Sequence, residues 1–241
     1  MNHRMRSLAS VALALVAAST LGSFRVGAAA SLTLTASAFT PYRTCTLTAT
    51  PSTMTPIIDA SVKQASAATN FGTATTNSVS SASLANQRLY LRFDLTQCSP
   101  ALPSNATVRL ATLRIYMSAV PTACRTMDIF PSTASWTEAG ITWNNQPFGT
   151  TLNNPASGSR SGSFDVGTPA GCANAVAGYV TGATVTSDVT LWVAGSSTNN
   201  GWMLRDDVES SATARTATFS AKNLGTLAQT PQLVITYVTV L

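Results

Sequence analysis

The sequence predicts an all-β protein folded as an antiparallel β-sandwich with few or no helices. Thr, Val, Ile and aromatic residues recur in short runs that are separated by clusters of Gly, Pro, Asn and Ser. Charged residues make up only 10% of the chain, which lacks the Glu-, Lys- and Leu-rich composition of a helical protein. Because 45% of the 241 residues are hydrophobic, the chain can still bury a sizeable core.

Residues 1–30 are predicted to be a secretory signal peptide. The segment starts with a basic stretch (MNHRMR), continues with the apolar run SLASVALALVAASTLG and ends with small residues (VGAAA) that suit cleavage near Ala30. The apolar run is short for a bilayer span and no later stretch reaches that length, so we expect no membrane span in the mature chain. An uncleaved anchor is the alternative. The expected location is secreted, extracellular or at the cell surface.

Cleavage would remove three arginines and the one histidine, His3. The mature chain would keep eleven basic residues against nine acidic ones, a net charge of +2 instead of +5, which does not predict a nucleic-acid partner. Without histidine, Ser-His-Asp and Cys-His catalysis cannot be assembled. A glycosidase needs two facing carboxylates, but Asp94 ends a strand and Glu138 sits in a turn. We therefore expect no enzyme, although a lyase that uses Tyr and Arg is left open.

The four cysteines are widely spaced and contain no CxxC pair, which argues against a zinc site. In an oxidising compartment they are expected to form two disulfides, whose pairing the sequence does not determine. They are Cys45, Cys98, Cys124 and Cys172.

After the leader, residues 31–56 form a Thr/Ser-rich segment that is either a linker or an extra pair of edge strands, and Cys45 favours attachment to the main body. Residues 57–241 are expected to form one sandwich domain, because no internal repeat is visible. The predicted strands are 88–95, 107–117, 126–130, 140–143, 187–194, 201–205, 216–220 and 232–240, and 187–194 has a short helix as its alternative.

Strict alternation in residues 88–95 (RLYLRFDL) separates an apolar face from a polar one. Solvent exposure alone can explain the polar face, but arginine and tyrosine also suit an acidic glycan, because guanidinium pairs with carboxylates and aromatic rings pack on sugars. Trp202, beside a loop, is the tryptophan expected to be exposed, whereas Trp136, Trp143 and Trp192 are expected in the core. The candidate ligand-binding residues are Arg88, Tyr90, Arg92, Arg114, Tyr116 and Trp202.

The order of several motifs resembles the DNRLRE-type domain, which is related to carbohydrate-binding module family 96. The motifs are DASV (59–62), TNFGT (69–73), RLYLRFDL, ATLRIYM, WTEAGITWNNQP (136–147), SDVTLWV, NNGWML, ATFSAKN and PQLVITY (231–237). The resemblance covers about residues 59–237. It implies a β-sandwich of jelly-roll type that is secreted and binds polysaccharide or cell-surface glycan, including acidic polymers such as alginate.

Two function classes follow. The first is a non-catalytic carbohydrate-binding module that holds acidic polysaccharide on the Arg/Tyr-lined strand face. The alternative is an extracellular structural or adhesive surface protein built on the same sandwich, which the cysteines and the Thr-rich segment favour. No cofactor is expected apart from a structural calcium ion, which jelly-roll modules often carry. Its candidate ligands are Asp59, Asn70 and Asp188, for which turn hydrogen bonding is the alternative role.

Overall fold

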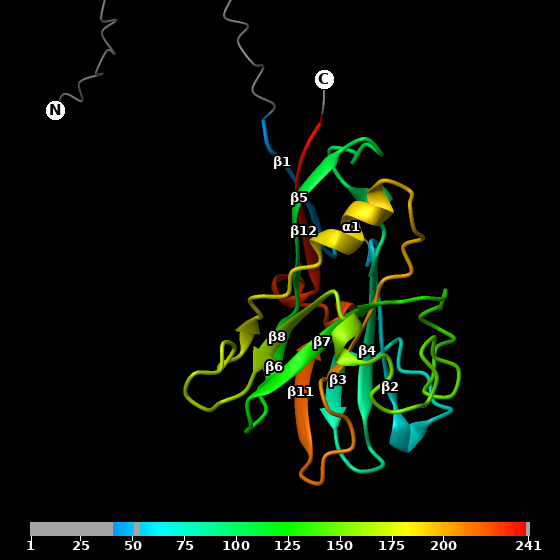
Figure 1. Ribbon diagram of the computed structural model, residues 1–241, viewed down its shortest axis with the longest axis vertical. Coiled ribbons are helices and arrows are strands. Elements are labelled where there is room, and N and C mark those ends of the chain that lie inside the picture. Colours follow the sequence, from blue (N-terminus) through cyan, green and yellow to red (C-terminus); the bar gives the residue numbers. More distant parts are fainter. Residues whose placement is uncertain (1–40, 51–53, 240–241) are drawn as a thin grey trace, which may run out of the picture. The chain divides into compact units, whose positions relative to one another are not determined.

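The computed structural model describes residues 41–50 and 54–239, and within them the chain is almost entirely β-strand and loop (Figure 1). The strands are β1 (Arg43–Leu47), β2 (Ile57–Lys63), β3 (Thr76–Ser81), β4 (Gln87–Phe93), β5 (Thr107–Arg114), β6 (Tyr116–Ala119), β7 (Arg125–Pro131), β8 (Gly162–Val166), β9 (Gly178–Tyr179), β10 (Trp202–Asp206), β11 (Arg215–Ser220) and β12 (Gln232–Val238). The described part holds one α-helix, α1 (Thr186–Val193). The predicted signal peptide lies outside the described residues.

The first layer is an antiparallel run of five strands in the order β8-β7-β10-β4-β2. Its central strand pairs are in register, so that Leu91 of β4 lies between Asp59 of β2 and Trp202 of β10. The alternating residues of β4 therefore present two faces, as the sequence predicts.

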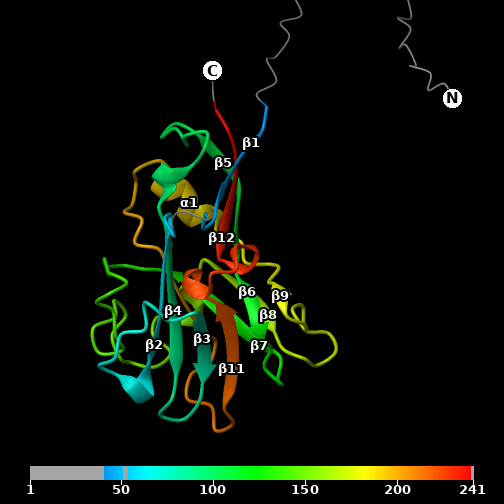
Figure 2. The same ribbon diagram turned by 180° about the vertical axis from the view of Figure 1, so that it is seen from behind.

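The second layer contains β3, β11, β6 and β9, and one pairing between Ser80 and Gln87 connects β3 to β4. Figure 2 shows β2, β4, β3 and β11 following one another around the molecule. A further sheet has the order β1-β12-β5, and only Ile115 separates β5 from β6. The fold is therefore all-β and sandwich-like, and the predicted fold class is confirmed.

The main core fills the space between these layers. It buries Leu89, Leu91 and Phe93 of β4 against residues such as Phe219 of β11 and Ile235 of β12. A second apolar cluster lies on the opposite face of the first layer, where Tyr90 packs with Phe130 and with Trp136, Ile141 and Trp143. The last three residues belong to the segment 132–161 between β7 and β8, which covers this face. The first layer is thus buried on both sides.

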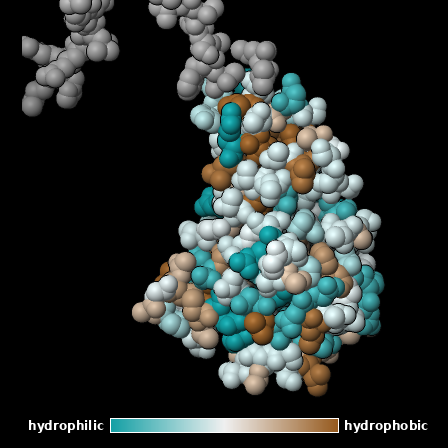
Figure 3. Space-filling view, in the orientation of Figure 1, coloured by the Kyte–Doolittle hydropathy of each residue, from teal (hydrophilic) through white to brown (hydrophobic). Residues whose placement is uncertain are grey.

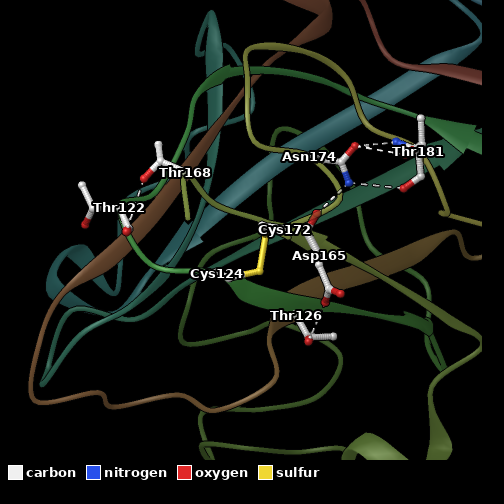
Figure 4. Close-up of a disulfide and its surroundings, with 8 residues drawn as sticks. All are labelled: Thr122, Cys124, Thr126, Asp165, Thr168, Cys172, Asn174 and Thr181. Atoms are coloured by element: carbon white, nitrogen blue, oxygen red, sulfur yellow. Dashed lines mark hydrogen bonds between the residues drawn. A yellow bond between two sulfur atoms is a disulfide. The ribbon is translucent and has the colours of Figure 1, made fainter. Parts of the chain in front are cut away.

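The four cysteines form two disulfides, as expected, and the structure supplies their pairing. Cys45 of β1 joins Cys98, which ties the edge strand of the three-stranded sheet to the segment after β4. Cys124 joins Cys172 and anchors the loop 167–177 to the start of β7 (Figure 4). The same loop is held by Asn174, whose amide donates to the Asp165 carbonyl and whose carbonyl oxygen accepts from the Thr181 N–H.

Most predicted strands are present with shifted ends, and two predictions need correction. Residues 140–143 are a turn, and residues 187–194 are largely α1, which corresponds to the alternative reading of that segment. The strands β2, β3, β8 and β9 were not predicted. Part of the segment 31–56 is β1, which pairs with β12 as an edge strand. No helix of the described residues is long and apolar enough to span a membrane.

Candidate functional site

The polar face of β4 is not the solvent-facing surface that its alternation suggests. Arg88 and Tyr90 are both 0% exposed, because the segment 132–161 covers them. Burial raises the pKa of Tyr90 well above its ordinary value. The expectation of an open Arg/Tyr face is therefore wrong at these two residues, and in this structure neither can touch a ligand at the surface.

Arg88 is an internal cross-link. Its Nε and Nη2 donate to the two carboxylate oxygens of Glu209, at 2.7 and 2.8 Å. The remaining donors reach the Gln146 side chain and the carbonyls of Gly149 and Thr151. Every N–H donor of the guanidinium is therefore hydrogen-bonded, and these bonds attach the segment 132–161 to the sheet.

Arg92, four residues after Arg88 on β4, has a different environment. Its side chain is partly exposed and makes no hydrogen bond or salt bridge with the other described residues, and its guanidinium lies 5.8 Å from the centre of the Trp136 ring. It lines an open hollow of about 400 Å³, which we call the arginine hollow. The residues of this hollow that matter below are Ile58, Arg92, Asp94, Thr96, Trp192 and Asn199.

Trp192 separates the arginine hollow from a second hollow of about 420 Å³, the helix hollow. The helix hollow is lined by residues of α1, of the loop after it and of the end of β7, among them Ser132, Thr133, Leu191, Thr198 and Asn200. In Figure 1 the chain leaves α1 and runs back past β4 toward the segment that follows β7. Figure 3 shows hydrophobic residues at the surface around α1 and β5, where Leu191 is 48% exposed.

The two tryptophans exchange the roles expected from the sequence. Trp202 is 0% exposed, and Trp192 lies on it with ring centres 4.6 Å apart and remains partly exposed. The exposure expected for Trp202 is therefore wrong. Helical spacing explains the exchange, because Val189, Trp192 and Val193 share the side of α1 that packs toward the core, and the large Trp192 ring extends beyond it.

Asp188 fixes this pair of rings. One of its carboxylate oxygens accepts from Trp202 Nε1 at 2.7 Å, and the other accepts from the Ser161 hydroxyl at 2.8 Å. Asp188 also lies in the first turn of α1, where a negative charge is favourable. The predicted calcium ligand thus orients the indole beneath Trp192.

The loop after α1 is pressed against β4. Gly201 has a φ of +73°, and a Cβ at this position would lie 2.4 Å from the Leu91 carbonyl oxygen, so only glycine fits. Asn199 Nδ2 donates to the Phe93 carbonyl at 2.8 Å. These contacts hold Asn199 and Asn200 between Trp192 and the end of β4.

The charges of the arginine hollow are of both signs. Hydrogen bonds from Thr96 keep the pKa of Asp94 below its ordinary value, so this carboxylate is ionised at neutral pH. Its oxygens accept from the Thr96 N–H, the Thr96 hydroxyl and Gln97. Asp94 is thus occupied by neighbours on its own turn, whereas the Arg92 guanidinium keeps its donors free for a ligand.

Arg114 and Tyr116 come together, but not with Arg92. The guanidinium of Arg114 lies 4.5 Å from the Tyr179 ring centre, and Tyr116 packs edge-on against the same ring. Arg114 also donates to the Gln232 side chain at 2.9 Å. These residues belong to β5, β6, β9 and β12, whereas Arg92 is on β4. Two of the six predicted binding residues therefore form a separate polar and aromatic cluster.

The three predicted calcium ligands are engaged in hydrogen bonds within the protein. Asp59 accepts hydrogen bonds from Asn77 and from the Lys222 N–H, and burial raises its pKa to about 7. Asn70 donates to the carbonyls of Glu138 and Ile141, and Asp188 is on α1. Among the described residues no three acidic, Cys or His side chains form a cluster suited to a metal ion. The calcium ion stays a prediction.

Sequence reasoning missed most of this site. Trp192, Asn199 and Asn200 belong to motifs of the family resemblance, SDVTLWV and NNGWML, but the sequence did not mark them as ligand-binding. Of the residues that line the two hollows, the sequence singled out Arg92 for binding and Asp188 for calcium. One signal was available: helical spacing in the segment 186–193 places Trp192 at the end of a short helix, next to the Asn/Gly-rich turn TNNG.

A search of the curated proteins finds no match to this chain. The model of the family described as carbohydrate-binding module family 96 matches residues 50–237, which include every strand from β2 onward apart from the last residue of β12. The match spans well over half of the chain and contains the whole Trp192 region. The chain therefore belongs to carbohydrate-binding module family 96.

Proposed function

We propose that this protein is a secreted, non-catalytic module that binds acidic polysaccharide across Trp192. The observation that carries the proposal is the position of this ring between two open hollows whose walls are rich in hydroxyl and amide groups. Family membership makes a carbohydrate the expected class of ligand. The predicted signal peptide and the two disulfides support export.

The groups around Trp192 match the chemistry of a sugar. An indole provides a flat apolar surface for the C–H face of a pyranose ring, and nearby polar groups can bond its hydroxyls. The hydroxyls of Thr133, Ser197 and Thr198 and the side-chain amide of Asn200 make no hydrogen bond with the other described residues. They are therefore available to a ligand in the helix hollow.

Arg92 supports an acidic polymer as the ligand. A guanidinium can make two parallel hydrogen bonds to a carboxylate, which a neutral sugar does not offer. Arg92 forms no salt bridge within the described part of the chain, although its charge is close enough to help keep the pKa of Asp94 low, so binding a uronate would not break an ion pair in direct contact. Asp94 lines the same hollow, and its negative charge would repel a ligand carboxylate that is placed next to it.

The acidic groups next to the hollows favour binding without catalysis. Asp188 is buried and accepts hydrogen bonds from Trp202 and Ser161, while Asp94 accepts from Thr96. Neither carboxylate is placed as a free acid or base toward a ligand. Prolonged incubation with any bound polymer should release no new reducing ends and no unsaturated sugars.

The test is electrophoresis of the mature protein through gels that contain alginate, polygalacturonate, methyl-esterified polygalacturonate or a neutral β-glucan. We expect retardation by the acidic polymers, loss of retardation in Trp192→Ala, and at least tenfold weaker binding in Arg92→Ala. The charge-matched control is Arg43→Ala, which removes an exposed arginine of β1, a strand that contributes no residue to the hollows. Thermal unfolding of each variant verifies that it is folded.

Equal retardation of the wild type and both site variants would place binding elsewhere, for example at the Arg114–Tyr179 cluster. Retardation by the neutral polymers alone would remove the role given to Arg92. The leader is tested separately: the exported protein should begin near Ser31.

One observation favours the structural alternative. Arg88, expected on a binding face, is instead locked to Glu209 inside the domain, as in a rigid building block. A surface protein of this kind would form ordered assemblies on the cell and show no retardation by any polysaccharide.

A further inference from the structure

The two hollows beside Trp192 carry charges of both signs, and negative charge is in excess. The charged residues that line the arginine hollow are Arg92 and Asp94, and the charged residue that lines the helix hollow is Asp188. One guanidinium is thus combined with two carboxylates. A surface that binds an acidic polymer can therefore neutralise few of its charges.

The arginine hollow offers a favourable position for one ligand carboxylate. A planar guanidinium such as that of Arg92 pairs with a single carboxylate through two parallel hydrogen bonds. Asp94 lines the same hollow and is exposed, and hydrogen bonds from Thr96 keep its pKa low, so its charge is present at neutral pH. A second ligand carboxylate in this hollow would meet that negative charge.

The helix hollow suits an uncharged sugar. Among the described residues that line it there is no arginine or lysine, and its one charged residue, Asp188, is a buried carboxylate. The groups that it offers to a ligand are uncharged, namely the hydroxyls of Thr133 and Thr198 and the side-chain amide of Asn200. These groups can bond sugar hydroxyls, whereas Asp188 would repel a carboxylate.

Both hollows border Trp192, so a chain that packs on this ring reaches into both of them. From this distribution of charge we infer that the ligand is a polymer whose acidic sugars are separated by neutral or esterified ones, and that a polymer with a carboxylate on every sugar binds less tightly. This inference rests on the proposed function, and it makes Asp94 a residue that determines specificity.

The experiment measures the affinity of the mature protein for polygalacturonates whose methyl esterification increases stepwise from none to complete. A salt concentration of about 0.15 M screens the net charge of the protein, and a chelator removes divalent cations that could neutralise Asp94. The affinity of the wild type should be highest at intermediate esterification. It should be about two- to fivefold lower for the unesterified polymer, the range typical of one pair of exposed charges.

Asp94→Asn tests the origin of this difference. The variant loses the charge but keeps an acceptor oxygen for the Thr96 N–H, and Asn caps a helical turn as well as Asp does. It should bind the unesterified polymer as tightly as the best partly esterified one. The matched control is Asp165→Asn, which changes an exposed carboxylate of β8 that accepts from the Thr126 hydroxyl and lines neither hollow.

Asp165→Asn should keep the wild-type dependence on esterification, and thermal unfolding verifies that both variants are folded. Arg92→Ala should reverse the dependence, because repulsion by Asp94 then remains without a compensating guanidinium. Its affinity should be highest for the fully esterified polymer.

A wild-type affinity that increases steadily as esterification decreases would overturn the inference, as would an Asp94→Asn variant that shows the wild-type dependence. In both cases the proposed function still stands if Trp192→Ala abolishes binding. Absence of binding to alginate and to every polymer of the series overturns both.

Discussion

Two arginines four positions apart on β4 have opposite roles. Arg88 is fully buried and paired with Glu209, whereas Arg92 lines a hollow and forms no salt bridge with the other described residues. Alternation assigns both side chains to the same face of the strand, so their difference depends on where the segment 132–161 covers that face.

We predict that Arg88→Ala lowers the free energy of unfolding by about 3–5 kcal/mol, because it leaves the Glu209 carboxylate buried without its partner. Arg92→Ala, the matched control on the same strand face, should change it by about 1 kcal/mol or less. Urea-induced unfolding followed by tryptophan fluorescence measures both. Similar losses in the two variants would mean that Arg92 is a structural residue as well.

At the scale of elements, α1 and the 132–161 segment explain why the predicted site and the observed one differ. Both segments contain apolar residues in the alternation typical of strands, namely Ile141 with Trp143, and Val189 with Leu191 and Val193. Ile141 lies in a turn, because its N–H donates to the Thr137 carbonyl. The alternation of Ile141 and Trp143 arises because both side chains pack onto the outer face of the sheet. Tertiary packing thus produced a pattern that sequence reasoning assigns to a strand.

Asp188 connects α1 to the sheet, and we predict that its loss affects both stability and binding. Asp188→Ala leaves the buried Trp202 Nε1–H and the Ser161 hydroxyl without their acceptor, so the free energy of unfolding should fall by about 1–3 kcal/mol. Binding of polysaccharide should also weaken, because Trp192 rests on Trp202.

Ser187→Ala, an exposed change on the same helix, is the control for Asp188→Ala and should leave both quantities within error of the wild type. Thermal unfolding and gel retardation measure the two effects. Weaker binding at unchanged stability would indicate that Asp188 contacts the ligand directly.

At the scale of the whole molecule, one buried network connects both faces of the sheet. Asp59 of β2 accepts from Asn77 of β3 and from the Lys222 N–H, and its own N–H donates to Glu138. The Lys222 ammonium bonds Glu138 at 2.6 Å and the Ile57 carbonyl at 2.9 Å. Two carboxylates and one ammonium group thus hold the 132–161 segment, β2 and the chain before β12 together.

This network should make stability depend on pH through Asp59. Burial raises its folded-state pKa to about 7, above the ordinary value of 3.8, and the neighbouring Glu138 charge adds to the rise. The folded protein therefore binds this proton more tightly than the unfolded chain does. The stabilisation is fully present below about pH 4 and is lost as the pH rises through about 7.

Asp59→Asn keeps an acceptor oxygen for Asn77 and Lys222 but cannot titrate. We predict that its free energy of unfolding, relative to the wild type, increases between pH 4 and pH 8, by an amount on the order of a few kcal/mol. Urea unfolding at several pH values in the presence of a chelator, which removes any calcium, measures it. Asp165→Asn, exposed on β8, is the control. A difference that stays constant with pH would contradict the assignment.

The sequence by itself determined the β-rich fold class, most strand positions, the number of disulfides and the relation to a carbohydrate-binding family, because local residue preferences and period-two alternation carry that information. Only the tertiary structure decided the cysteine pairing and which residues reach solvent. A strand pattern distinguishes two faces, but the covering of a face depends on a distant segment. The segment 132–161 buried Arg88 and Tyr90, whereas α1 and the turn 195–201 left Trp192 and Arg92 at the surface.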